Sequence, residues 1–231
     1  MDPAVLAQLL QPEWVVHLRT VLRTHVANRL VSAGDLSNGL TIETLVSGQE
    51  LTTTVAGSSI SFSTGVNSGS VVAADIRGRN GILHRIDRVL VPTVLTRNLP
   101  TAATESGLST LVSFVISAGL TDAIQAAQGN FTVLAPSNAA FASLDADLVS
   151  QLNADPALLR RVLLYHVLPG VFPFERLTPG SMIATAGSDG PISVTSDGIA
   201  IFLNGQTVAQ ANIVAQNGLI HMIDSVLFPP G

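Results

Sequence analysis

The stretch Asn217–Pro230, NGLIHMIDSVLFPP, is nearly repeated earlier in the chain as Asn80–Pro92, NGILHRIDRVLVP, at a constant offset of 137 positions. Such an internal repeat indicates that both stretches belong to the same folding unit. The Asn-Gly pair favours a tight turn, and the apolar residues that follow lie on both faces, which is typical of a buried strand. The prolines that come next end it, because proline donates no hydrogen bond to a sheet. Each copy is therefore predicted to be a turn followed by a buried, terminal strand.

The repeat extends to two further parts of the chain. Residues 18–26 match residues 159–167 at an offset of 141, and Val71, Ala74 and Ile76 match Val208, Ala211 and Ile213 at an offset of 137. The change of offset falls among predicted short strands, where loop lengths vary at little free-energy cost. Residues 106–157 have no counterpart in the first copy. The sequence thus predicts two domains, a truncated one over 1–95 and a complete one over 96–231.

Composition excludes several classes of site. The chain has 231 residues, 47% hydrophobic and only 12% charged, and no cysteine, so a disulfide framework, a thiol nucleophile and a thiolate metal site are excluded. Residues 1–97 carry eight arginines against seven acids, and residues 98–231 carry three arginines against nine acids. Neither part is basic enough to predict nucleic-acid binding.

The sequence pattern predicts neither a membrane-spanning helix nor a signal peptide. No apolar run approaches the roughly 18 residues that a membrane-spanning helix needs. The start, Met1-Asp2-Pro3, does not resemble a signal peptide. We therefore expect either a cytosolic protein or a piece of a longer one, with membrane association only through partners or missing regions.

Apolar spacing predicts helices in both copies and short strands between them. The first copy begins with two helices and continues with strands broken by glycine. The second begins with helices and a short buried strand, FTVLA, which Pro136 stops. Asp197-Gly198 between two apolar runs predicts a hairpin. The expected helices are 3–11, 13–27, 109–127, 137–144, 147–152 and 156–167, and the expected strands of the first copy are 41–45, 51–55, 59–62 and 71–76.

Three stretches of the second copy resemble the signatures of the fasciclin domain family: FTVLAPSNAAF at 131–141, LLYHVLPG at 163–170 and the closing stretch from Asn217. The first copy has the closing signature, carries Thr24-His25 where the family has Tyr-His, and lacks the opening signature. The resemblance implies an α+β fold, a wedge of two β-sheets with surrounding helices, in one complete copy and one N-terminally truncated copy.

The resemblance also implies a function: a non-enzymatic adhesion or matrix-binding module, extracellular, at the cell surface or in a periplasmic or luminal space. Its partner would be a cell-surface or matrix protein or a glycan. An alternative is an accessory subunit of a membrane-associated complex on the luminal or periplasmic side. Residues matching family motifs linked to adhesion are Tyr165 and His166 with their neighbours Leu164 and Val167, and Asn212 and Ile213 before the closing signature. For Tyr165 and His166 the competing interpretation is packing of a helix end onto the sheet.

Catalytic and metal sites are not predicted. The five histidines lack the close spacing of metal ligands, and no serine lies in a Gly-x-Ser-x-Gly frame. A hydrolase or metal-dependent enzyme built on the His166/His221 region is the alternative from another class. Asn130-Phe131-Thr132 is a glycosylation sequon in a secreted protein. A truncated copy would leave an exposed strand edge, which predicts self-association or pairing with another chain.

Overall fold

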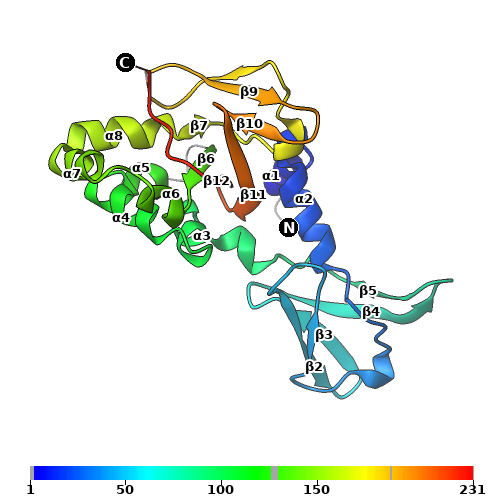
Figure 1. Ribbon diagram of the computed structural model, residues 1–231. Helices are drawn as coiled ribbons and strands as arrows, with labels where there is room; N and C mark the ends of the chain where they lie inside the picture. Colours follow the sequence, from blue (N-terminus) through cyan, green and yellow to red (C-terminus); the bar gives the residue numbers. More distant parts are fainter. Residues whose placement is uncertain (1–2, 126–129, 188, 231) are drawn as a thin grey trace. The chain divides into compact units, whose positions relative to one another are not determined.

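The computed structural model describes residues 3–125, 130–187 and 189–230. The chain divides into two compact units, called here unit 1 (Met1–Thr96) and unit 2 (Arg97–Gly231) (Figure 1). Each unit combines helices with one β-sheet, five-stranded in unit 1 and seven-stranded in unit 2. The predicted α+β class is confirmed.

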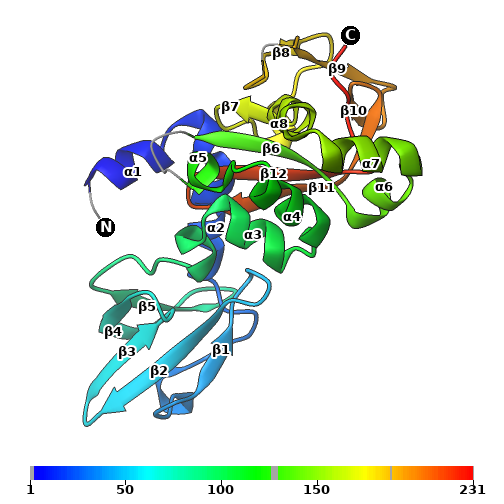
Figure 2. The same ribbon diagram turned by 90° about the vertical axis from the view of Figure 1, so that its left-hand side faces the viewer.

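The closing stretch forms an interior strand of the sheet of unit 2. Strand β12 (Gly218–Ile223) pairs in parallel with β6 (Phe131–Pro136) and antiparallel with β11 (Gln206–Ala215) (Figure 2). All of its residues except Met222 are buried, which confirms the predicted buried strand. The sheet order is β7-β6-β12-β11-β10-β9-β8, completed by β7 (Val167–Pro169), β10 (Ile201–Leu203), β9 (Ile192–Ser196) and β8 (Met182–Ile183).

The turn before β12 lies one residue earlier than predicted. Gln216 and Asn217 form the turn, and Gly218 is already the first residue of the strand. A Cβ atom on Gly218 would lie 1.8 Å from the carbonyl oxygen of Phe131 in β6. This glycine is therefore required because the backbone of β6 approaches so closely, a tertiary reason that the Asn-Gly turn signal does not contain.

Several helices of unit 2 begin at side chains that cap their free backbone N–H groups. Ser137 Oγ accepts a hydrogen bond from Ala140 N, and Asp155 Oδ1 accepts from Leu158 N. None of the helices in the described ranges is long and apolar enough to cross a membrane. The helices are α3 (Leu99–Glu105), α4 (Ser109–Ser117), α5 (Thr121–Gln125), α6 (Asn138–Ala142), α7 (Ala146–Ala154) and α8 (Pro156–Tyr165).

The helical region predicted over 109–127 consists of two helices, α4 and α5. Helix α4 ends at Ser117, and a turn through Gly119, which has φ of 63°, separates it from α5. Glycine adopts positive φ without a steric penalty, so it ends helices readily. Residues 126 and 127 of the predicted helix lie outside the described residues.

Unit 2 has two hydrophobic cores, one on each side of β6 and β12. The first, called the helix-side core, packs Val133 and Ile220 against α3, α4, α6, α7 and α8. The second, called the strand-side core, contains Leu134 and Ile223. Neighbouring residues of one strand point to opposite faces, so β6 contributes to both cores. The other members of the strand-side core are Tyr165, Leu168, Leu177, Ile183, Ile192, Val194, Leu203 and Leu227.

Unit 1 begins with two helices and continues as an antiparallel sheet. Its strands follow each other in sequence order, and β5 lies at the edge of the sheet. The predicted strands of this unit are confirmed, with ends shifted by at most three residues. Its elements are α1 (Pro3–Leu9), α2 (Val15–Thr24), β1 (Thr41–Glu43), β2 (Glu50–Ala56), β3 (Ser59–Ser63), β4 (Ser68–Arg77) and β5 (Ile82–Ile86), with short 3-10 segments at Pro12–Trp14, Ala33–Asp35 and Thr93–Thr96.

The core of unit 1 corresponds to the strand-side core of unit 2. Ile42 and Leu90 are buried in it, and their counterparts at the offsets of the repeat are Ile183 and Leu227. The remaining buried members are Val31, Leu51 and Phe62. The two copies therefore use the same half of the module in the same way.

Candidate functional site

Tyr165, the first candidate from the sequence, is the last residue of α8 and is only 2% exposed. Its hydroxyl accepts a hydrogen bond from Asn204 Nδ2 at 2.7 Å and donates to Pro191 O at 3.4 Å. Asn204 Oδ1 accepts in turn from Ser193 N at 2.7 Å. Tyr165 thus joins the end of α8 to the β9–β10 hairpin.

His166 is equally buried and bonds to two distant backbone groups. Its Nε2 accepts from Leu227 N at 2.9 Å, so Nδ1 carries the proton and donates to Val162 O at 2.8 Å. Burial lowers the pKa of His166 to about 4, and the bond to Val162 opposes this shift. The imidazole is therefore neutral near pH 7, and both of its nitrogens are already bonded.

His221 connects β12 to β11 and to the loop at Phe172 in the same manner. It is fully buried, its Nδ1 accepts from Asn212 N at 3.1 Å, and its Nε2 donates to Phe172 O at 2.8 Å. Burial lowers the pKa of His221, while the bond to Phe172 and the nearby Glu175 charge act in the opposite direction.

Asn212 occupies a left-handed backbone position, with φ of 60°. Its Oδ1 accepts from Phe174 N at 3.0 Å, and its Nδ2 donates to Glu175 Oε2 at 2.9 Å. The counterpart in unit 1 is Asp75, with φ of 52°, and its Oδ1 accepts from Ala33 N at 2.9 Å. A short polar side chain that bonds to nearby backbone suits this conformation in both copies.

Two histidines of unit 1, His25 and His84, repeat the contacts of unit 2. His25 Nδ1 bonds to Val21 O at 2.8 Å, and His25 Nε2 accepts from Leu90 N at 3.0 Å. His84 Nε2 bonds to Val31 O at 2.9 Å. Because the same backbone groups are connected in both copies, these histidines hold loops and helix ends against the sheet.

The other candidates differ in accessibility. Val167 is 5% exposed, whereas Leu164 and Ile213 are half-buried and pack against the helix-side core. Asn130 is exposed, and its carbonyl accepts a hydrogen bond from Gly170 N at 2.7 Å. The adhesive roles of these residues and the glycosylation of Asn130 stay predictions.

Tyr165→Phe is expected to destabilise unit 2 by about 1–2 kcal/mol, because it leaves the half-buried Asn204 amide without its acceptor. The measurement is urea unfolding, with hydrogen exchange in β9 and β10 as the readout for unit 2. Trp14, the only tryptophan and a buried residue of unit 1, gives an internal reference by fluorescence. An unchanged free energy of unfolding would show that the Asn204 bond contributes nothing.

A metal-binding cluster is not found among the described residues: no three His, Asp or Glu side chains come together in a way that could hold an ion. His166 and His221 bond to separate backbone groups rather than to each other. The bonds just described occupy both nitrogens of each ring. An activating contact to a nucleophile would therefore require one of these bonds to break.

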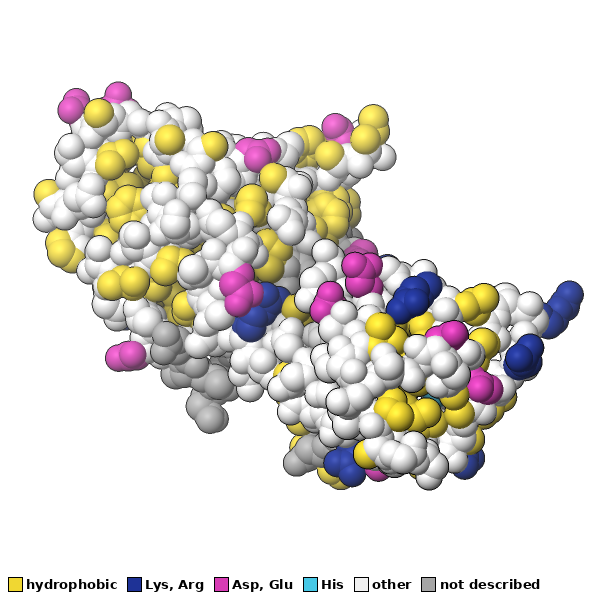
Figure 3. Space-filling model, turned by 90° about the horizontal axis from the view of Figure 1, so that it is seen from below, with side chains coloured by type: hydrophobic (Ala, Val, Ile, Leu, Met, Phe, Trp, Pro, Cys, Tyr) yellow, Lys and Arg dark blue, Asp and Glu magenta, His cyan; other side chains and the backbone are white. Residues whose placement is uncertain are grey.

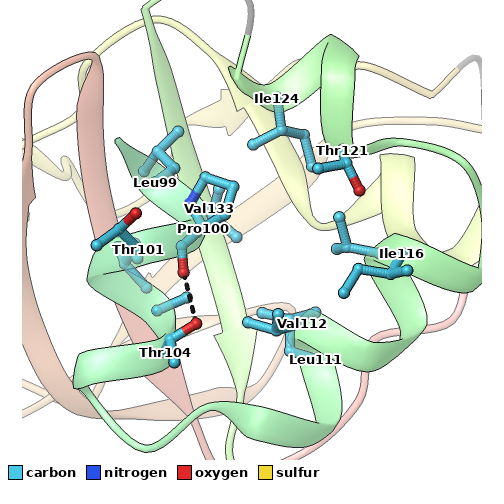
Figure 4. A pocket seen from close by; sticks show the side chains of 13 residues that line it. Leu99, Pro100, Thr101, Thr104, Leu111, Val112, Ile116, Thr121, Ile124 and Val133 are labelled. Atoms are coloured by element: carbon cyan, nitrogen blue, oxygen red, sulfur yellow. Dashed lines mark hydrogen bonds between the residues drawn. The ribbon is translucent and has the colours of Figure 1, made fainter. Parts of the chain in front are cut away.

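An apolar pocket of about 240 Å³ lies in unit 2 between α3, α4 and α5. Figure 4 shows Leu99, Val112, Ile116 and Ile124 around a central space, with Val133 of β6 behind them. Its 13 lining residues carry no charged side chain, so it can hold an apolar group only by removing it from water. The sequence did not distinguish this pocket, because its residues have the spacing of ordinary core positions.

Comparison with known proteins assigns the family. A model of the fasciclin domain matches residues 1–92 and 106–229. The chain belongs to the fasciclin domain family. A structure titled as a FAS1 domain pair from the insect cell adhesion molecule fasciclin I covers 92% of this chain and 80% of that one, with a TM-score of 0.50 and 18% identity. This likeness confirms the predicted fasciclin-type fold.

Relatives of this fasciclin-domain chain come from bacteria and animals. Protein sll1483 of Synechocystis is 39% identical over 133 residues, which are 56% of this chain and 71% of that protein. Transforming growth factor-beta-induced protein ig-h3 of Sus scrofa is 30% identical over 213 residues, and human periostin is 28% identical over 215 residues. The matches cover 92% and 93% of this chain, but only 30% and 25% of those two proteins.

Proposed function

We propose that this fasciclin-domain chain is a non-enzymatic adhesion or matrix-binding module that acts outside the cell. Its partner would be a cell-surface or matrix protein or a glycan. The observation that carries the non-enzymatic part is the use of His166 and His221, whose ring nitrogens bond to backbone groups that hold the fold together. The adhesive part is supported by the family and by its member in an insect cell adhesion molecule.

The Tyr-His motif would support adhesion indirectly in this proposal. A partner must touch surface atoms, and Tyr165 and His166 are each 2% exposed. Their contacts position the end of α8 and the segment at Leu227, so they would keep a binding surface in shape. Leu164, Asn212 and Ile213 are the more accessible members of the two motifs.

The test immobilises the folded chain and measures cell attachment and the retention of proteins from a matrix extract. Attachment is expected to exceed that to a heat-denatured sample of the same chain. Tyr165→Phe should retain attachment at temperatures where it stays folded. Loss of attachment by the folded variant would place the Tyr165 hydroxyl in the partner contact instead.

The enzymatic alternative is tested on the same preparation by elemental analysis. We expect no stoichiometric zinc or iron. Stoichiometric metal that is lost with His166→Gln or His221→Gln would overturn the non-enzymatic proposal. Attachment no better than that of the denatured control would overturn the adhesive one.

A further inference from the structure

The apolar pocket between α3, α4 and α5, called here the α3–α5 pocket, joins the surface of unit 2 to its helix-side core. Its inner lining includes Val133 of β6 and Ile220 of β12, which are 8% and 1% exposed and belong to that core. Its outer lining includes Ile116 of α4, which is 62% exposed. Figure 3 shows that hydrophobic side chains reach the surface of unit 2, in the left-hand part of the view. A ligand that enters beside Ile116 thus reaches the core.

The wall that α5 forms is fixed at both of its ends. Just before α5, Leu120 is 1% exposed, and its N–H donates to Val115 O of α4 at 3.0 Å. Towards the other end, Asn217 Nδ2 donates to Ile124 O at 3.1 Å, and Asn217 is itself 4% exposed. Movement of α5 onto α3 would disturb these contacts, so the pocket persists without a ligand. Binding sites for small molecules are usually preformed in this way.

The opposite wall leaves room because its side chains are short. Helix α3 contributes Pro100, Thr101, Ala103 and Thr104 to the lining. A leucine or isoleucine at these positions would fill space that the short side chains leave open. Protein interiors are otherwise closely packed, with few voids larger than a water molecule. The pocket is therefore a product of the composition of α3.

The lining accepts hydrocarbon and disfavours polar groups. Its residues are apolar except for three threonines. Two of these hydroxyls are already bonded: Thr101 Oγ1 donates to Asn98 Oδ1 at 2.8 Å, and Thr104 Oγ1 donates to Pro100 O at 2.9 Å (Figure 4). A polar group in the inner part would lose its bonds to water without replacing them. The inserted part of a ligand is therefore a hydrocarbon.

The volume of the pocket sets the length of that hydrocarbon. The pocket measures about 240 Å³. An apolar cavity of about 150 Å³ already holds a benzene molecule. At roughly 30 Å³ for a group the size of a water molecule, the α3–α5 pocket holds about eight methylene groups. A chain of this length is shorter than the acyl chains of membrane lipids.

The third threonine, Thr121, suits an uncharged head group. Figure 4 shows Thr121 between Ile124 and Ile116. It is half-buried, and across the described residues its hydroxyl has no hydrogen-bond partner in the chain. The next residue, Asp122, is exposed and negative, and residues 98–231 carry three arginines against nine acids. This charge disfavours an anionic head group.

We propose that the α3–α5 pocket binds one unbranched alkyl chain of about eight carbons, carried by a free amphiphile with an uncharged, hydroxyl-type head group. The chain fills the space in front of Val133, and the oxygen of the head group bonds to the Thr121 hydroxyl. This site goes beyond the proposed adhesion. Tyr165 belongs to the strand-side core, on the other side of β6 and β12, so either activity can fail without the other.

The test follows the side-chain methyl signals of the full 231-residue chain by proton–carbon NMR during titration with 1-butanol, 1-hexanol and 1-octanol. The signals expected to shift are those of Val112, Val115, Ile116 and Ile124. Removing one methylene from water changes affinity about fourfold, so each two-carbon step should raise affinity about 16-fold. 1-Decanol should gain less than one such step, because the pocket is already full. Octanoate should bind at least tenfold more weakly than 1-octanol.

The decisive variant of the chain is Val112→Phe. Val112 is half-buried and borders the central space in Figure 4, so the larger ring should occupy part of the pocket and weaken 1-octanol binding at least tenfold. Val149→Phe is the matched control, because Val149 is a half-buried valine of α7 beside a separate hollow of about 210 Å³. It should bind 1-octanol as the wild-type chain does. Hydrogen exchange of β12 checks that both variants are folded.

Thr121→Val tests the contact with the head group. Valine removes the hydroxyl and keeps a similar shape. The variant should bind 1-octanol about fivefold more weakly, with the gain for each two-carbon step unchanged. An unchanged affinity would overturn the assignment of the head group to Thr121. Octanoate bound as tightly as 1-octanol would overturn the uncharged head group.

An affinity that does not rise with chain length, or equal binding by the wild-type chain and Val112→Phe, would overturn the proposal. Binding to phosphatidylcholine vesicles without binding to 1-octanol would assign the pocket to a membrane and overturn the free ligand. Dimers of the chain that 1-octanol dissociates in analytical ultracentrifugation would assign the pocket to a second copy and overturn the proposed occupant.

Discussion

Gly218→Ala is expected to unfold unit 2 or to destabilise it by at least about 4 kcal/mol, a size reserved for severe core defects. The added Cβ would lie 1.8 Å from Phe131 O, 2.9 Å from Phe131 C and 3.1 Å from Phe131 N. These are backbone atoms of the adjacent strand, so no side-chain rotation relieves the overlap. Relief requires β6 and β12 to separate, and these strands lie between the two cores of the unit.

Gly81→Ala provides the matched comparison within the same chain. It is the equivalent substitution in unit 1, where the Cβ would have open space. Its effect on stability should stay below about 1 kcal/mol, within the usual range for a sterically free Gly→Ala change. Denaturant unfolding measures the change in the free energy of unfolding for both substitutions. Trp14 fluorescence reports on unit 1, and hydrogen exchange of β12 reports on unit 2. Equal effects of the two substitutions would contradict the role assigned to the β6 contact.

Unit 2 is expected to lose stability as the pH falls from about 6.5 to about 4. The pKa of His166 is lowered from 6.5 to about 4 in the folded chain, chiefly by burial. The unfolded chain therefore binds a proton near pH 6.5 that the folded chain does not bind, so acidification favours unfolding. At about 1.4 kcal/mol for each pKa unit, the contribution of His166 is roughly 3 kcal/mol, present above pH 6.5 and lost at pH 4. His221, whose pKa is also lowered, adds a loss of the same sign.

His166→Gln tests the source of this pH dependence. Glutamine carries an acceptor for Leu227 N and a donor for Val162 O, but it does not titrate. The variant should be less stable at pH 7, and its free energy of unfolding should fall less steeply between pH 6.5 and 4. A pH profile parallel to that of the wild-type chain would show that His166 is not responsible.

Local patterns predicted most elements of the fold. The strands of unit 1 and the hairpin at Asp197-Gly198 depend on residues close in sequence, and each was found. The repeat predicted that Asn80–Pro92 and Asn217–Pro230 form equivalent strands. Errors arose where glycine acted through a neighbour in space or through positive φ, as at Gly218 and Gly119.

The candidate site was less predictable, because its contacts join distant parts of the chain. Sequence identified Tyr165 and His166, but not the partners that explain them, Asn204 and Leu227, which are 39 and 61 residues away. Asn204-Gly205 has the composition of a turn, and nothing local shows that its amide reaches a tyrosine. The sequence also did not predict that Leu83 is exposed, because its sequence neighbours match those of a buried strand.

The parallel pairing of β12 with β6 has a consequence for biosynthesis. Strand β6 leaves the ribosome about 80 residues before its parallel neighbour β12, a delay of several seconds at roughly 5–20 residues per second. Throughout that interval the nascent chain exposes Val133 and Leu134, which later lie on opposite faces of the finished sheet. During translation of the second module, β6 therefore remains without its parallel neighbour until the closing residues emerge.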